Sequence, residues 1–162
     1  MSRSHDDQQD AQWLAEAVEL AVCNVTAGGG PFGALIVREG AVLATGVNAV
    51  TTTNDPTAHA EVVAIRTACK TIGDFRLTGC VLVTSCEPCP LCLAAALWAR
   101  VERVLYAADR HDAARGGFDD LAFYALFSTP RADWPMAVTS VAVTAPTAPF
   151  AAWQAKPDRV DY

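Results

Sequence analysis

The stretch that decides the fold reads CVLVTSCEPCPLCLAAALWAR and covers residues 80–100. It starts with a short apolar run, Cys80–Thr84, which predicts a buried strand. Pro90 is typical of the first position of a helix, so we expect a helix from there to about Arg100. A strand that leads into a helix is the unit from which α/β folds are built.

The chain before this stretch predicts a helix followed by a hairpin of two strands. Apolar residues recur at helical spacing over about 8–27, and Gly28–Pro31 end that helix. Two β-like runs, 34–37 and 41–47, flank Glu39-Gly40, which is typical of a tight turn between antiparallel strands.

Helices and strands alternate along the rest of the chain. Asp55-Pro56-Thr57 is typical of a helix start, and Gly73 follows the expected helix end at about Ile72. Later segments predict a strand at 103–107, a helix at about 118–127, a strand at Val138–Val143 and a short helix after Pro149. Such alternation predicts a three-layer α/β/α sandwich with a mixed five-stranded sheet.

The length and composition suit one domain. The chain has 162 residues, of which 52% are hydrophobic, so a sizeable core can form. We expect a single domain over 1–162, with residues 1–10 flexible. No run of eighteen apolar residues occurs, and residues 1–10 lack the features of a signal peptide. The expectation is a cytoplasmic protein without a membrane partner.

The charge balance argues against nucleic acid as a partner. The formal net charge is −6 at pH 7, and the 12 Lys and Arg residues are scattered. A nucleic-acid binder usually presents a basic face, because phosphate contacts dominate its affinity. We therefore expect a small-molecule substrate.

The cysteine pattern favours metal ligation over disulfides. In a secreted mini-protein six cysteines would predict three disulfides. This chain is longer and has a full apolar core, so reduced thiols are the better interpretation. The six are Cys23, Cys69, Cys80, Cys86, Cys89 and Cys92.

Three residues of metal-ligating type lie at the starts of two predicted helices. His59 lies near the start of one, and Cys89 and Cys92 lie at the start of the other. Residues three apart share a helix face, and a helix N-terminus favours a thiolate. Three protein ligands leave one position for water or hydroxide, which is typical of catalytic zinc. The sequence therefore predicts one Zn²⁺ per chain.

Glu61 follows the predicted ligand His59 by two residues and is suited to shuttle protons. It can take a proton from a zinc-activated water and deliver it to a ring nitrogen and then to a leaving amine. His-x-Glu followed by Pro-Cys-x-x-Cys matches the signature of zinc deaminases. The combined motif predicts hydrolytic removal of an amino group from a nucleobase-like ring.

Two other metal or redox interpretations compete with this one. Cys89 and Cys92 alone could be a redox pair. Cys86 extends them to a Cys-x-x-Cys-x-x-Cys run, which can hold an iron–sulfur cluster. That cluster needs a fourth thiolate that no other cysteine clearly supplies, and it leaves His59 and Glu61 without a role. We expect Cys86 to be a buried residue at a strand end.

At these residues the chain resembles the cytidine deaminase-like superfamily, and within it the bacterial guanine deaminase branch. The metal motif marks the superfamily, whereas Gly-Phe-Asp-Asp at 117–120 and the final Tyr162 are similar to the guanine branch. The matching stretches are 30–34, 54–61, 84–90, 98–100, 117–120 and 162.

The resemblance implies a role for each matching residue. His59, Cys89 and Cys92 would bind zinc, Glu61 would be the proton shuttle, and Asp120 would be a second acid near the leaving amine. The base would be bound by Phe32, Asn48, Trp98 and Tyr162. Tyr162 would reach the pocket of a partner subunit, because this branch forms homodimers with exchanged C-terminal segments, here about 130–162.

Several of these residues also have a purely structural interpretation. Asp119 and Asp120 could be a helix-start acidic pair, and either could be the second acid. Asn48 could be a turn residue, and Tyr162 a frayed terminus. Phe32 and Trp98 could pack in the core.

The function expected is deamination of free guanine to xanthine and ammonia. Other amino-bearing rings remain open: cytosine analogues, isocytosine, aminotriazines, guanosine or cytidine, because one contact changes specificity by only ~1–3 kcal/mol. The tRNA adenosine deaminases share the metal motif, but the acidic balance argues against an RNA substrate. From a different class, the chain could be an inactive metal-binding interaction module.

Overall fold

The computed structural model describes residues 3–162, which divide into two compact units. The first unit extends to Ala125 and the second runs from Leu126 to Tyr162. The expected flexibility at 1–10 falls partly on Met1 and Ser2, which lie outside the described residues; from Arg3 the chain is helical. No helix in the described part of the chain combines the length and the hydropathy that a membrane crossing needs.

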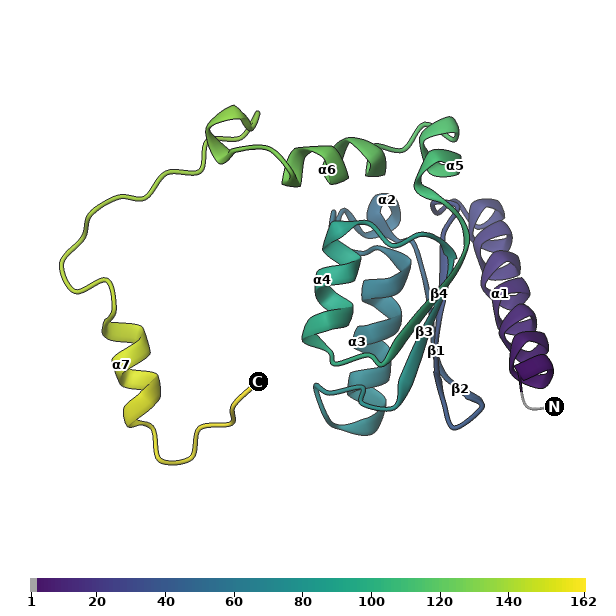
Figure 1. Cartoon of the computed structure of the whole chain (residues 1–162), viewed down its shortest axis with the longest axis horizontal. Helices are drawn as coiled ribbons and strands as arrows, with labels where there is room; N and C mark the ends of the chain where they lie inside the picture. Colours follow the sequence, from purple (N-terminus) through teal and green to yellow (C-terminus); the bar gives the residue numbers. More distant parts are fainter. Residues whose placement is uncertain (1–2) are drawn as a thin grey trace. The chain divides into compact units, whose positions relative to one another are not determined.

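A mixed sheet organises the first unit (Figure 1). Its strand order is β2-β1-β3-β4, with the strands at Gly33–Arg38 (β1), Ala41–Val47 (β2), Cys80–Cys86 (β3) and Arg103–Ala108 (β4). β1 and β2 form the expected antiparallel hairpin, and β1 is also antiparallel to β3. β3 and β4 are parallel, which confirms the crossover that the sequence predicts through the helix between them.

The prediction of a fifth strand at Val138–Val143 is wrong, since the sheet has four strands in the described residues. Residues 138–143 form neither helix nor strand, and Val138, Val141 and Val143 are exposed. Alternating β-branched residues favour a strand only where a neighbouring strand pairs with the backbone. This segment therefore has the composition of a strand, but no strand in the described chain pairs with it.

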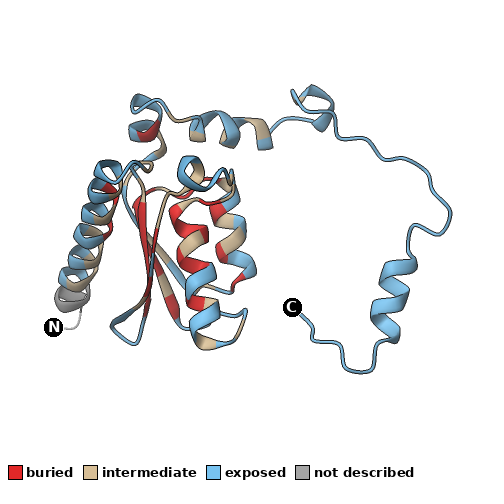
Figure 2. Cartoon of the chain, turned by 180° about the vertical axis from the view of Figure 1, so that it is seen from behind, coloured by how far each residue is buried: buried red, intermediate tan, exposed pale blue. Residues whose placement is uncertain are grey.

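Helices cover both faces of the sheet, which confirms the three layers that the alternation predicts (Figures 1 and 2). α1 (Arg3–Thr26) lies on one face, and α3 (Ala60–Ile72) and α4 (Pro90–Trp98) lie on the other. Successive strand side chains point to opposite faces. Leu35 and Val37 therefore pack towards α1, whereas Ala34 and Ile36 pack towards α3 and α4. Burial on both faces explains why β1 is apolar without alternation.

The helix expected from Asp55 begins later, at Ala60. The Asp55 carboxylate accepts hydrogen bonds from the backbone N–H of Thr57 at 2.8 Å and from its hydroxyl at 2.7 Å. This Asx-type turn competes with helix, and His59, just before the first helical residue, is still extended. Helical periodicity does not reveal where such a turn ends.

Two short helices lie in segments where the sequence predicted none. α2 (Val50–Thr53) follows β2, and α5 (Arg110–Arg115) follows β4. Asp109 starts α5 with a capping box, in which its carboxylate accepts from the backbone N–H groups of His111 and Asp112. Helices this short have no apolar periodicity to detect. The remaining helices are α6 (Asp120–Phe127), a 3₁₀ turn at Arg131–Asp133 and α7 (Ala148–Ala155), the expected C-terminal helix.

Gly46 lets the backbone of α3 approach the sheet directly. A Cβ atom at this position would lie 2.2 Å from the carbonyl oxygen of Ala60 and 2.4 Å from the backbone nitrogen of Ala64. Both contacts are with backbone atoms, which cannot move without moving the helix. The position of His59, one residue before Ala60, therefore depends on the absence of a side chain at Gly46.

We expect Gly46→Ala to lower the free energy of unfolding by about 1–3 kcal/mol, the usual cost of overpacking a core. Urea unfolding followed by circular dichroism measures the change. Thr45→Ala is the matched control, because Thr45 is the exposed neighbour in β2 and should change stability by less than about 0.5 kcal/mol. Equal stability of Gly46→Ala and the parent chain would contradict this packing.

Candidate metal centre and adjoining cavity

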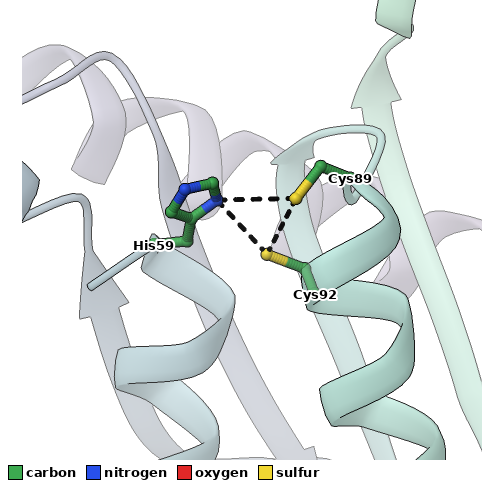
Figure 3. Close-up of side chains that lie close together, drawn as sticks. All are labelled: His59, Cys89 and Cys92. Atoms are coloured by element: carbon green, nitrogen blue, oxygen red, sulfur yellow. Dashed lines mark hydrogen bonds between the residues drawn. The ribbon is translucent and has the colours of Figure 1, made fainter. Parts of the chain in front are cut away.

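His59, Cys89 and Cys92 converge where two helices begin (Figure 3). His59 is the N-cap of α3 and Cys89 is the N-cap of α4, and neither side chain caps its own helix. Both side chains are therefore available to point towards one another, and Cys92 joins them from the first turn of α4. In the described residues these three form a group of ligand atoms that all lie within 4.8 Å.

The distances between the three donor atoms fit a tetrahedral zinc ion. Nδ1 of His59 lies 3.6 Å from Sγ of Cys89 and 3.5 Å from Sγ of Cys92, and the two sulfurs are 3.6 Å apart. With Zn–S near ~2.3 Å and Zn–N near ~2.05 Å, tetrahedral angles place two sulfurs about 3.8 Å apart and nitrogen and sulfur about 3.6 Å apart. The donor set and its spacing therefore suit zinc.

Contact between the two thiols shifts their pKa values in opposite directions. The hydrogen bond between Cys89 and Cys92 lowers the pKa of Cys89 to about 4, and the neighbouring His59 lowers it further. The same contact with Cys89, together with burial, raises the pKa of Cys92. The pKa of His59 is raised, chiefly by its hydrogen bond with Cys89. A second charge on Cys92 requires a cation between the sulfurs, as zinc–thiolate ligation supplies.

Glu61 lies buried beside this cluster, in the first turn of α3, with 5% of its surface exposed. Burial raises the pKa of its carboxyl, and its interaction with Cys92 acts in the opposite direction. The hydroxyl of Thr84 donates to Oε1 of Glu61 at 3.5 Å. A carboxyl with few partners at a cavity wall is suited to exchange protons.

A cavity of about 260 Å³ adjoins the cluster. Six of the nine predicted site residues line it: Phe32, Asn48, His59, Glu61, Cys89 and Asp120. Cys92 is fully buried next to Cys89. The other lining residues are Gly30, Val50, Thr51, Glu87, Phe118, Asp119 and Phe123. The structure thus brings together residues that are up to 93 positions apart in the sequence, from Gly30 to Phe123.

Trp98 and Tyr162 are not placed in this cavity. Trp98 ends α4 with 60% of its surface exposed, and the guanidinium of Arg100 lies 5.9 Å from its ring centre. Tyr162 belongs to the second unit, where its ring contacts Trp153 edge-on at 6.3 Å. The expected roles of Trp98 and Tyr162 in binding the base stay predictions.

Phe32 and Asn48 are held at the cavity wall by neighbours. The Phe118 ring packs edge-on against Phe32, with 4.8 Å between the ring centres. Asn24 donates from Nδ2 to the carbonyl oxygens of Gly30 and Asn48, both at 2.8 Å. A Cβ atom at Gly30 would lie 2.8 Å from Oδ1 of Asn48. Asn24 thus joins the two segments that carry Phe32 and Asn48.

Several residues of this site were not predicted from the sequence, among them Asn24, Glu87, Phe118 and Phe123. Phe118 and Glu87 belong to the stretches that match the guanine branch, so those stretches contained a signal for them. Asn24 is a polar residue near the end of an amphipathic helix, where a contact with distant loops has no local signature. Phe123 lies on the exposed helix α6.

Cys86 lies outside the cluster of three donor atoms. It is buried at the end of β3, as expected, and its sulfur lies 3.6 Å from the carbonyl oxygen of Asp109. Burial raises the pKa of its thiol to about 11, which disfavours the thiolate that a metal ligand needs. The geometry does not support a three-cysteine iron–sulfur site.

We expect Cys92→Ala to abolish tight binding of Co²⁺, a spectroscopic substitute for zinc, whereas Cys86→Ala should leave it intact. The measurement is the thiolate-to-cobalt absorbance that develops as Co²⁺ is titrated into the metal-free chain. Cys86→Ala is the matched control, because both cysteines are buried and only Cys92 belongs to the cluster. Loss of cobalt binding in Cys86→Ala alone would overturn the ligand set.

Comparisons with known proteins agree with a zinc-binding site at this position. The family model for the cytidine and deoxycytidylate deaminase zinc-binding region matches residues 7–108. A guanine deaminase of Bacillus subtilis (strain 168) is 50% identical over 151 residues, which cover 93% of this chain and 97% of that protein. An X-ray structure of guanine deaminase from Bacillus subtilis superposes with a TM-score of 0.91 at 50% identity, over 94% of this chain and 98% of that chain.

A second class of relative is similar over a shorter region. A tRNA-specific adenosine deaminase of Buchnera aphidicola subsp. Schizaphis graminum is 33% identical over 110 residues, which cover 68% of this chain and 73% of that protein. The match to the Bacillus guanine deaminase spans 151 residues and must therefore include part of the chain after residue 108, beyond the family model.

Proposed function

The chain belongs to the cytidine and deoxycytidylate deaminase zinc-binding family, and we propose that it hydrolyses free guanine to xanthine and ammonia. The observation that carries this proposal is the cluster of His59, Cys89 and Cys92 with the buried Glu61 beside it. Three donors at zinc-like spacing and one carboxyl are what hydrolytic deamination of a base needs. The likeness to guanine deaminase over 93% of the chain supports guanine as the base.

His59, Cys89 and Cys92 would hold one zinc ion per chain. A zinc ion with three protein ligands lowers the pKa of water at its fourth position towards ~7, which supplies a nucleophile at neutral pH. Glu61 would take a proton from the attacking water while the C–O bond forms at C2, and it would pass that proton to the ring nitrogen. Asp120 assists as the second acid when the amine leaves as ammonia, so that one water is consumed for each amine released.

The cavity supports a neutral, flat ring as substrate. Its volume of about 260 Å³ suits a single base, and the ring of Phe32 offers a surface for stacking. The amide of Asn48 can hydrogen-bond the edge of the base.

The charge of the lining argues against nucleotides and RNA. Its charged residues other than His59 are four carboxylates: Glu61, Glu87, Asp119 and Asp120. This set disfavours the phosphates of a nucleotide or of RNA. The shorter match to the tRNA deaminase agrees with a free base.

The second unit supports assembly of two copies. Met136, Val141, Phe150, Val160 and Tyr162 each expose more than 60% of their surface in the single chain. Large exposed apolar side chains in one segment mark an interaction surface. We therefore extend the proposal to a homodimer in which a segment of about 130–162 packs on the partner and Tyr162 reaches the partner's cavity.

Ammonia release from a panel of compounds tests the substrate. The panel contains guanine, guanosine, cytosine, cytidine, isocytosine, adenine and an aminotriazine, each with and without prior chelation. Turnover of guanine that is lost on chelation and restored by zinc is expected. Turnover of pyrimidines or triazines, with little turnover of guanine, would support zinc-dependent deamination but reject guanine as the substrate. Deamination of tRNA alone would favour the second class of relative.

In the same assay Glu61→Gln should lower kcat by about 10²–10⁴-fold, because the amide cannot carry the proton. Glu102→Gln is the matched control, since Glu102 is exposed and lies outside the cavity. Wild-type rates in Glu61→Gln would show that another group moves the proton.

Hybrid dimers test the exchanged tail. We expect Glu61→Gln and Tyr162→Ala chains each to be nearly inactive alone. When the two are co-expressed, about half of the dimers are hybrid, and one of their two sites combines an intact Glu61 with an intact Tyr162, so about a quarter of wild-type activity returns. Activity no higher than the mean of the two parents would place Tyr162 in its own chain's site or outside any site.

A further inference from the structure

A closed ring of side-chain contacts lies next to the cluster of His59, Cys89 and Cys92. The carboxylate of Glu87 accepts from the backbone N–H of Arg110 at 3.0 Å and from its Nε at 2.9 Å, and Nη2 of Arg110 donates to the other oxygen. This ion pair is half-buried, with 12% of the Glu87 side chain and 33% of the Arg110 side chain exposed. The forked geometry uses the planar guanidinium in a way that an ammonium cannot.

Tyr124 completes the closed contact. The guanidinium carbon of Arg110 lies 3.7 Å from the centre of the Tyr124 ring, a close cation–π contact. The hydroxyl of Tyr124 donates to the carbonyl oxygen of Pro88. Pro88 follows Glu87 and precedes the metal donor Cys89, so the contacts return to the segment where they began. We call Glu87, Arg110 and Tyr124 the bracing cluster.

The bracing cluster joins the segment of Cys89 to the helix that carries Asp120. Tyr124 follows Asp120 by four residues on α6, so both side chains lie on the same face of that helix. α6 contributes no buried residue, and its position therefore depends on a few side-chain contacts. Glu61, by contrast, lies on the well-packed helix α3 and needs no such support.

We propose that Glu87, Arg110 and Tyr124 are positioning residues that hold Asp120 at the cavity wall beside Cys89. The inference rests on the proposed function, in which Asp120 assists departure of the amine. Displacement of a catalytic group by about 1 Å can cost about a hundredfold in rate. Arg110 and Tyr124 are not among the residues that line the cavity, so these two members of the bracing cluster act on kcat through Asp120 and not through contact with the base.

A double-mutant cycle with guanine tests this inference. Tyr124→Phe removes only the hydroxyl that contacts Pro88, and we expect kcat to fall by about tenfold, with KM changed by less than about twofold and zinc content unchanged. In an Asp120→Asn background the same substitution should change kcat by less than about twofold, because the group that it positions is already disabled.

Arginine variants on α5 provide the matched comparison. Arg110→Lys keeps the charge but loses the fork, so we expect it to lower kcat about as much as Tyr124→Phe. Arg115→Lys is the control, because Arg115 pairs with Asp112 on the exposed side of the same helix, and wild-type kcat is expected. Full activity of Arg110→Lys, or equal effects of Tyr124→Phe with and without Asp120, would overturn the proposal.

Hydrogen exchange separates this proposal from the proposed function. Tyr124→Phe should speed deuterium uptake by peptides that cover α6 and leave those that cover α3 unchanged. If the wild-type chain does not turn over guanine, the proposed function fails, and faster exchange in α6 still supports the bracing of Asp120. Unchanged exchange in α6 would overturn the bracing whatever the activity.

Discussion

The site depends on the meeting of two helix N-termini at one point. His59 and Cys89 are the N-caps of α3 and α4, and their donor atoms lie 3.6 Å apart. A shift of either helix by one turn would move its donor by about 5.4 Å and destroy the tetrahedral spacing. The partial positive charge of both N-termini also stabilises the thiolates that zinc requires.

The sheet holds α3 on one face and α1 on the other through close contact between backbones. Gly46 leaves no space between β2 and α3, and on the opposite face Gly33 lies where a Cβ atom would meet the carbonyl oxygen of Ala17 at 2.5 Å. The Gly33 N–H also donates to Oγ of Ser85 at 3.1 Å, which joins β1 to the end of β3. Because Gly33 and Gly46 have no side chains, contacts between backbone atoms set the distance between helix and sheet at these positions.

The two acids of the proposed mechanism are supported in different ways. Glu61 is buried on a helix that packs against the core, so its position follows from the fold itself. Asp120 lies on α6, a helix without buried residues, and in the proposed arrangement the contacts among Glu87, Arg110 and Tyr124 compensate for that weak packing. A rigid proton shuttle and a braced second acid can thus occupy one cavity although their helices differ in stability.

The sequence by itself predicted the cluster of His59, Cys89 and Cys92, singled out Glu61 beside it, and indicated the alternation of strands and helices. These features are local: the i, i+3 spacing of Cys89 and Cys92, the two-residue step from His59 to Glu61 and the apolar runs are all read within one element. Only the tertiary structure decided that Val138–Val143 is no strand, that α3 begins at Ala60, and that Glu87 and Phe118 line the cavity while Trp98 is exposed. Strand pairing and cavity lining depend on contacts between distant residues, and spacing along the chain does not encode those contacts.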